Sequence, residues 1–98
     1  MSTMNRMRVR IENETYLSLE SISDCYQCNA AWIREAYEFG LLGVGRRYEG
    51  HVVLHVKVLD RVAQVVRLGR YEGLGFEAIV VLLGTIETEP AQGGYLER

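Results

Sequence analysis

Apolar and polar residues alternate near the start of the chain and then change to a helical period. The segment 7–11 (Met-Arg-Val-Arg-Ile) alternates with period two, which predicts a half-buried strand. A short helix is predicted over 19–26, where apolar side chains recur at Leu19, Ile22 and either Cys25 or Tyr26. Ser18 is its expected N-cap, because a serine hydroxyl can accept from an unpaired backbone N–H of the first turn.

A second helix is predicted over 30–39. Asn29 is a suitable N-cap, and Gly40 can adopt the left-handed conformation that ends a helix. One face of this helix is apolar and carries Ile33, Ala36 and Tyr37. Two short helices joined by a few residues predict a helix-turn-helix.

After Gly40 the pattern first favours strands and then a longer helix. Glycine-broken and β-branched residues over 41–55, with Glu49-Gly50 between them, predict a hairpin. A helix is predicted over 56–71, with Leu59, Val62, Val66 and Gly69 facing inward. The residues expected to face water are Lys57, Arg61, Gln64, and Arg67 or Arg70.

The last predicted helix, over 76–88, is apolar almost all round. Its inward side chains are expected to be Ile79, Leu82, Leu83 and Ile86, with Val80 and Val81 beside them. One thin core cannot cover so many apolar side chains, so we expect this helix to form a homodimer. Residues 1–89 are expected to form one domain, and Pro90 and the later glycines predict a flexible tail over 90–98.

Composition limits the class of protein. The chain has 98 residues, 48% hydrophobic and 24% charged, which predicts a single small globular domain without extensive disorder. No apolar run approaches the ~18–20 residues of a membrane span. The start is polar and basic, unlike a secretory signal. With two cysteines we expect a reduced, cytoplasmic protein without disulfides.

Helix, turn, helix, hairpin, long helix and short helix is the element order of a winged helix-turn-helix. We therefore expect a mainly α fold with a small hairpin wing and an N-terminal strand. The segment 33–42 (IREAYEFGLL) resembles the second helix and exit of MerR-type regulators, and 68–79 resembles the later helix pair of that family. The resemblance runs from Tyr16 to Gly84.

The chain departs from the DNA-reading members of that family at two places. Those members usually have an aromatic residue at the position of Glu35 and an arginine where Val52 or Val53 stands. Chaperone modulators of the CbpM type share the MerR-like core but bind the J-domain of DnaJ-like co-chaperones. The chain looks similar to them in length and element order. The resemblance implies a non-enzymatic inhibitor or adaptor of a DnaJ-like co-chaperone.

The distribution of charge is compatible with that partner. Acidic residues are concentrated in 12–38 and 71–98, whereas basic residues are concentrated in 1–11 and 39–70. J-domains carry a basic second helix, which an acidic surface would attract and orient. The candidate contacts are Glu20, Asp24, Glu35, Glu38 and Trp32. The tryptophan is either an exposed binding residue or part of the core.

The alternative function is that of a MerR-family DNA-binding regulator, which could act in the heat-shock response. Arg34 in the second helix and Arg46 and Arg47 in the wing would then contact phosphates. The carboxylates of Glu35 and Glu38 argue against this alternative, because they would repel the phosphate backbone.

Metal and enzyme chemistry find little support. Cys25 and Cys28 with His51 and His55 imitate a zinc site, but the stretch from Cys28 to His51 is much longer than the usual ~12–15 residues. On one strand the two histidines would lie ~13 Å apart. Cys25, in the first helix, is expected to be packed rather than exposed. No nucleophile has an adjacent base, so we expect no enzyme, cofactor or metal.

Overall fold

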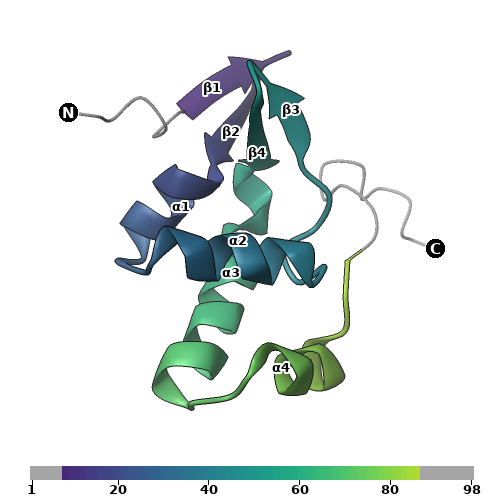
Figure 1. The fold of residues 1–98 in the computed structure, drawn as a ribbon. Coiled ribbons are helices and arrows are strands. Elements are labelled where there is room, and N and C mark those ends of the chain that lie inside the picture. The colour runs from purple at the N-terminus through teal and green to yellow at the C-terminus, as the bar shows by residue number, and fades with distance from the viewer. Residues whose placement is uncertain (1–7, 87–98) are drawn as a thin grey trace.

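The computed structural model describes residues 8–86 (Figure 1). In chain order its elements are the strands β1 (Arg8–Ile11) and β2 (Glu14–Ser18), the helices α1 (Leu19–Cys25) and α2 (Ala30–Glu38), the strands β3 (Arg46–Tyr48) and β4 (His51–His55), the 3₁₀-helix η1 (Val56–Val58), the helix α3 (Leu59–Val66), the π-helical segment η2 (Arg67–Tyr71) and the helix α4 (Phe76–Leu83). The first residue of the predicted N-terminal strand and the predicted tail over 90–98 lie outside the described residues.

The prediction of a mainly α, MerR-like winged helix-turn-helix is wrong. The described chain is mixed α/β, with 51% helix, 22% strand and a curled four-stranded antiparallel sheet. The strand order is β1-β2-β4-β3. The expected N-terminal strand and hairpin are both present, but an additional strand, β2, joins them into one sheet.

The sequence pattern does not predict β2, because the turn before it lacks typical turn residues and its buried positions do not alternate with exposed ones. It is joined to β1 by Glu12 and Asn13, whose φ angles of 55° and 68° are both positive, as in a type I′ hairpin turn. Glutamate is not a typical residue of such turns, so the pair gives no clear turn signal. The end of the strand, from Tyr16 to Ser18, is buried at every position and therefore does not alternate.

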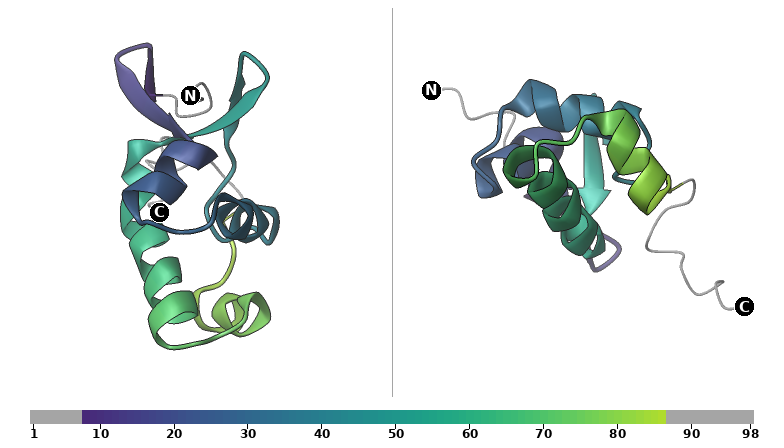
Figure 2. Two further views of the ribbon diagram at one scale, coloured as in Figure 1. Left: turned by 60° about the vertical axis from the view of Figure 1, so that its left-hand side comes forward. Right: turned by 90° about the horizontal axis from the view of Figure 1, so that it is seen from below.

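Two hairpins meet at the centre of the sheet through a short stretch of pairing between β2 and β4, which we call the sheet joint. β2 pairs with β4 through Tyr16 with His55, Leu17 with Leu54, and Ser18 with Val53. Figure 2 (left) shows the β1–β2 and β3–β4 hairpins diverging from this joint, directly above α1. Because β2 and β4 run antiparallel, with Ser18 opposite Val53 and His55 opposite Tyr16, α1 and η1 begin at opposite ends of this joint.

The predicted helix pair and its caps are confirmed. The Ser18 hydroxyl accepts from the Ser21 N–H at 3.0 Å, and Asn29 Oδ1 accepts from the Ala31 N–H at 2.7 Å. Each bond pairs a backbone donor that a helix start otherwise leaves without a partner, and is worth about 1 kcal/mol. Gly40, with φ of 81°, follows the C-cap of α2 as predicted.

The helix predicted over 56–71 is confirmed in extent, but it changes geometry twice, from 3₁₀ through α to π. Val62 and Val66 are buried as expected. The prediction that Arg61 faces water is only partly correct, because its side chain is half-buried and hydrogen-bonded to three backbone carbonyls. Its Nε donates to the Leu41 carbonyl at 2.8 Å, and its terminal nitrogens donate to the carbonyls of Leu83 and Gly84. Sequence periodicity does not show these three acceptors, which come from distant segments.

α4 is shorter than predicted. It ends at Leu83 because Gly84 adopts a φ of 77°, and the chain continues without helix to Ile86. Ile79 is buried as expected, but Leu82 is 62% exposed, so the prediction that it faces inward is wrong. The remainder of the predicted helix, residues 87 and 88, lies outside the described residues.

The core lies between the sheet joint and the four α-helices. Its buried side chains come from β2, α1, α2, the loop after α2, β4, η1, α3 and α4: Leu17, Leu19, Ile22, Ile33, Ala36, Leu41, Leu42, Leu54, Val58, Val62, Val65, Val66 and Ile79. Seen from below, α4 lies next to the C-terminal half of α2 (Figure 2, right). This packing leaves the outer sides of α2 and α4 at the surface.

Candidate protein-binding surface

α2 presents a polar stripe opposite its buried side. Ile33 and Ala36 face the core, whereas Arg34, Glu35 and Glu38 are exposed. The three exposed residues are one, three or four positions apart, so they share the outer half of the helix. The stripe therefore carries two carboxylates and one guanidinium.

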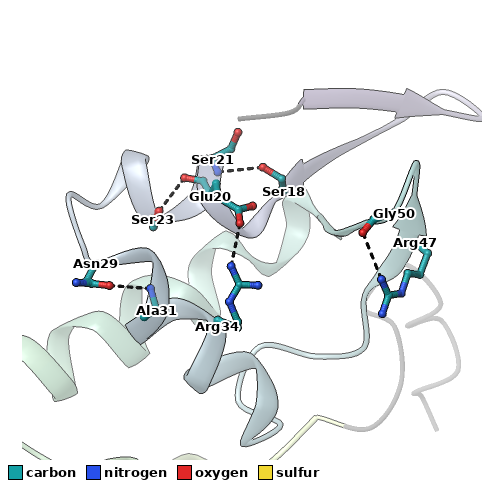
Figure 3. Close-up of polar contacts among 9 residues, drawn as sticks. All are labelled: Ser18, Glu20, Ser21, Ser23, Asn29, Ala31, Arg34, Arg47 and Gly50. Carbon is teal, nitrogen blue, oxygen red and sulfur yellow. Dashed lines mark hydrogen bonds and ion pairs between the residues drawn. The ribbon is translucent and has the colours of Figure 1, made fainter. Parts of the chain in front are cut away.

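The guanidinium is already paired. Arg34 donates to Glu20 Oε2 at 3.0 Å, and the pair joins α2 to α1 (Figure 3). The side chains are 51% and 21% exposed, respectively, so solvent screens the pair and it contributes only about 0.2–1 kcal/mol. Its main effect is on charge, because Arg34 is neutralised by Glu20 and does not neutralise Glu35 or Glu38.

Glu35 and Glu38 thus keep their negative charge available at the surface. Within residues 8–86, no lysine, arginine or histidine forms an ion pair with either carboxylate. Glu38 borders a polar hollow of about 230 Å³ between α2 and the β3–β4 hairpin, which is also lined by Glu20, Arg34, Arg47 and His51. Glu35 borders a second depression on the opposite side of the stripe.

That second depression, the α2–α4 groove, has a volume of about 530 Å³ and is lined by Glu35, Phe39, Gly75, Phe76, Glu77 and Ala78. Two of its lining residues are aromatic, and the rings of Phe39 and Phe76 lie 5.2 Å apart between centroids. Two carboxylates, Glu35 from α2 and Glu77 from α4, stand at its border. The sequence did not identify this groove, since α2 and α4 are brought together only by the fold.

The remaining two predicted contacts lie elsewhere. Asp24 is exposed in the last turn of α1 and lines neither depression. Trp32 is half-buried, and its ring lies 5.0 Å from the ring of Phe76. On the side of η2 it touches Gly69, where even a Cβ atom would be 2.3 Å from Trp32 Cζ2. Trp32 therefore packs α2 against η2 and α4, and the five predicted residues do not form one surface.

The three arginines of the DNA-binding alternative do not form a basic surface either. Arg46 donates to the Tyr16 hydroxyl at 3.1 Å and stands over the Tyr16 ring, 5.4 Å from its centroid. Arg47 is exposed and donates to the Gly50 carbonyl at 3.3 Å. Arg34 is paired with Glu20 as described above. Arg34 and Arg47 share the polar hollow with Glu20 and Glu38, so no net positive charge gathers there.

The cysteines and histidines are dispersed. Cys25 is exposed, so the prediction that it packs inside is wrong, and Cys28 is half-buried with its Sγ 3.7 Å from an Arg70 nitrogen. No group of three or more His, Cys, Asp or Glu side chains that could hold a metal ion occurs within residues 8–86.

His55 is buried and has partners on both ring nitrogens. Nδ1 accepts from the Lys57 N–H at 3.0 Å, so Nε2 carries the proton and donates to Glu14 Oε1 at 2.5 Å. This hydrogen bond is the main reason that the pKa of Glu14 lies below its ordinary value of 4.5; desolvation opposes the shift, and the positive charges of Lys57 and Arg10 add to it. The contact ties β2 to the end of β4.

We expect this contact to make stability fall in acid. A carboxyl whose pKa is lowered in the folded state stabilises the fold above its unfolded pKa and loses that effect as pH falls through its folded pKa. The melting-temperature difference between the parent protein and Glu14→Gln should therefore shrink as the pH falls from neutral to well below 4.5. The exposed neighbour Glu12 supplies the control, Glu12→Gln. A difference that stays constant over the whole range contradicts the assignment.

No protein-family model matches the chain, and neither the curated proteins nor the solved structures give a significant match. Among residues 8–86, none of the helices combines the length and the apolar character needed to cross a bilayer.

Proposed function

We propose that this protein is a non-enzymatic modulator of a DnaJ-like co-chaperone, whose basic J-domain helix it binds through the exposed carboxylates of α2. The observation that carries the proposal is that Glu35 and Glu38 share one exposed stripe and have no ion-pair partner among the described residues. Opposite charges on a partner helix would raise the rate of association and fix its orientation.

The α2–α4 groove supports the same class of partner. An amphipathic helix binds by placing its apolar side in an apolar groove and its charged residues at the rim. Here the adjacent rings of Phe39 and Phe76, which line the groove, would receive the apolar side. Glu35 and Glu77 at the border would receive lysine or arginine. The groove thus extends the acidic stripe that the sequence indicates.

A non-enzymatic adaptor role also fits the hydrogen bonding of the buried histidine. Both nitrogens of the buried histidine, His55, are occupied within the fold, so it is a poor general base. We propose no catalytic role, no cofactor and a cytoplasmic location. Cys25 and Cys28 are free thiols, as is usual in a reducing compartment.

Calorimetric titration with the J-domain proteins of the same genome tests the proposal. We expect binding by the parent protein and at least about tenfold weaker binding by Glu35→Lys/Glu38→Lys, because two attractive contacts become repulsive. Glu49→Lys/Glu72→Lys is the matched control, since it makes the same charge change at exposed positions outside α2. Absence of binding to every J-domain contradicts the function, whereas equal affinity of both double variants contradicts only the choice of surface.

The DNA-binding alternative is less well supported. Its best observation is the exposed guanidinium of Arg47. Arg34 is neutralised by Glu20, and Arg46 is held at Tyr16. If an electrophoretic shift of duplex DNA appeared at low salt and were lost in Arg46→Ala/Arg47→Ala, the alternative would replace the first proposal.

A further inference from the structure

The outer face of α4 is apolar and uncovered within the described chain. Ala78, Val81 and Leu82 follow the spacing of one helix face, opposite the buried Ile79. Val81 is 83% exposed and Leu82 is 62% exposed. Figure 2 (right) shows α4 at the edge of the molecule, with no other described element beyond it. Adjacent exposed aliphatic side chains of this kind mark an interaction surface more often than a solvated one.

The charges at the two ends of α4 are opposite. Glu77 is exposed in the first turn. At the other end the guanidinium of Arg61 lies against the carbonyls of Leu83 and Gly84. The N-terminus of α4 has no side-chain cap, so its helix dipole remains positive there. α4 therefore has an exposed carboxylate in its first turn, exposed aliphatic side chains in its last turn and a guanidinium against its last carbonyls.

We infer that α4 pairs with α4 of a second copy of this chain in antiparallel orientation. A two-fold interface requires a surface that is complementary to itself, so that each contact occurs twice. Antiparallel pairing places Val81 and Leu82 of both copies together at the centre. It also brings Glu77 of each copy toward the end of α4 where the partner's Arg61 lies, and it opposes the two helix dipoles.

Charge complementarity favours a second copy over a basic helix on this face. A basic helix would meet Glu77 favourably but would meet the guanidinium of Arg61 with the same sign of charge. A second copy pairs both ends. This pairing and the proposed function share Glu77 and Ala78, which also line the α2–α4 groove, so a second copy and a helix bound in the groove would compete for these two residues. Val81→Glu on α4 and Glu35→Lys/Glu38→Lys on α2 keep the tests of the two proposals separate.

Sedimentation equilibrium from low micromolar to several hundred micromolar protein tests the dimer. We expect the apparent mass to rise from the chain mass of 11.2 kDa toward twice that value. Val81→Glu should raise the dissociation constant at least about tenfold, since a charge would be placed in the centre of the interface. Val44→Glu, at an exposed apolar position outside α4, should leave the dimer intact.

A mass near 11.2 kDa at every concentration overturns the inference, as does a dimer that Val81→Glu leaves unchanged. The first result means that another part of the chain or a different partner covers the face. Because Val81 is so exposed, its replacement should not unfold the protein, and circular dichroism of Val81→Glu checks this. Leu82→Asp provides a second variant on the same face with the same expectation.

A charge reversal tests the antiparallel arrangement. Glu77→Arg brings two like charges together in each half of the antiparallel pair, so we expect several-fold weaker association, and a smaller effect at high salt. Glu72→Arg is the control, because it reverses an exposed charge just outside α4. If Val81→Glu separates the copies but Glu77→Arg acts no more strongly than Glu72→Arg, the antiparallel arrangement is wrong.

Discussion

Replacing Gly69 with alanine is expected to lower the free energy of unfolding by about 2 kcal/mol, although alanine is the better helix former. Gly69 lies in the π-helical segment η2, directly against the indole of Trp32. An added Cβ would lie 2.3 Å from Trp32 Cζ2 and 2.9 Å from Cη2, well inside van der Waals contact. The indole cannot simply turn away, because it also packs against Phe76 and the core.

The opposing effects can be compared directly. Alanine in place of glycine inside a helix gains about 1 kcal/mol, whereas overpacking of a closely packed site costs about 1–3 kcal/mol and occasionally more. Because the overlap here is with a rigid ring, we expect the steric cost to exceed the gain. Urea denaturation monitored by circular dichroism measures the change, and the emission of Trp32, the only tryptophan, should also shift as the ring moves.

A double-mutant cycle identifies the cause. Trp32→Phe removes the part of the ring that the new methyl group would strike. In that background Gly69→Ala should cost much less or even stabilise the protein, because the steric overlap is relieved while the gain in helix propensity remains. An equal cost in both backgrounds would show that Trp32 is not the reason glycine is required at position 69.

Arg61→Met should cost about 2–4 kcal/mol, because one guanidinium serves three backbone carbonyls. Leu41 is fully buried, so its carbonyl loses a donor that water cannot easily replace. The carbonyls of Leu83 and Gly84 lie at the end of α4, where the helix itself offers no N–H. Methionine keeps the apolar stem and therefore isolates the loss of the hydrogen bonds.

The loss should be concentrated in α4, because the same side chain joins α3, the loop after α2 and the end of α4. Hydrogen exchange of the amides from Ile79 to Leu83 should accelerate more than that of α1. Arg67→Met, at an exposed position one helical segment further along, is the control and should change little. Uniform acceleration throughout the chain would contradict a local anchoring role.

Local signals predicted the start of α1 and both ends of α2 well. Ser18 and Asn29 cap α1 and α2 through bonds that span two or three residues, and Gly40 ends α2 through its own backbone freedom. The hairpin turn at Glu49-Gly50 is also a local property. The missing strand, β2, depends on pairing with β4, which lies far away in the sequence. This long-range pairing is why the mixed α/β class could not be predicted from these patterns.

For the candidate binding surface, too, the sequence predicted what depends on one helix and missed what depends on contacts between distant segments. The helical period of α2 places Glu35 and Glu38 on its outer side, and the structure agrees. The neutralisation of Arg34 by Glu20 requires the angle between two helices, which no spacing encodes. The packing of Trp32 on Gly69 and the position of Phe76 in the groove likewise depend on contacts between distant segments.

The strand order leaves β1 and β3 as the edges of the sheet, each with backbone groups that another extended chain could pair with. Both edges carry arginines: Arg8 and Arg10 on β1, and Arg46 and Arg47 on β3. When two such edges approach, their like charges repel, which opposes the edge-to-edge growth of aggregates and fibrils. The two open edges of the sheet thus repel the same edges of other copies of the chain.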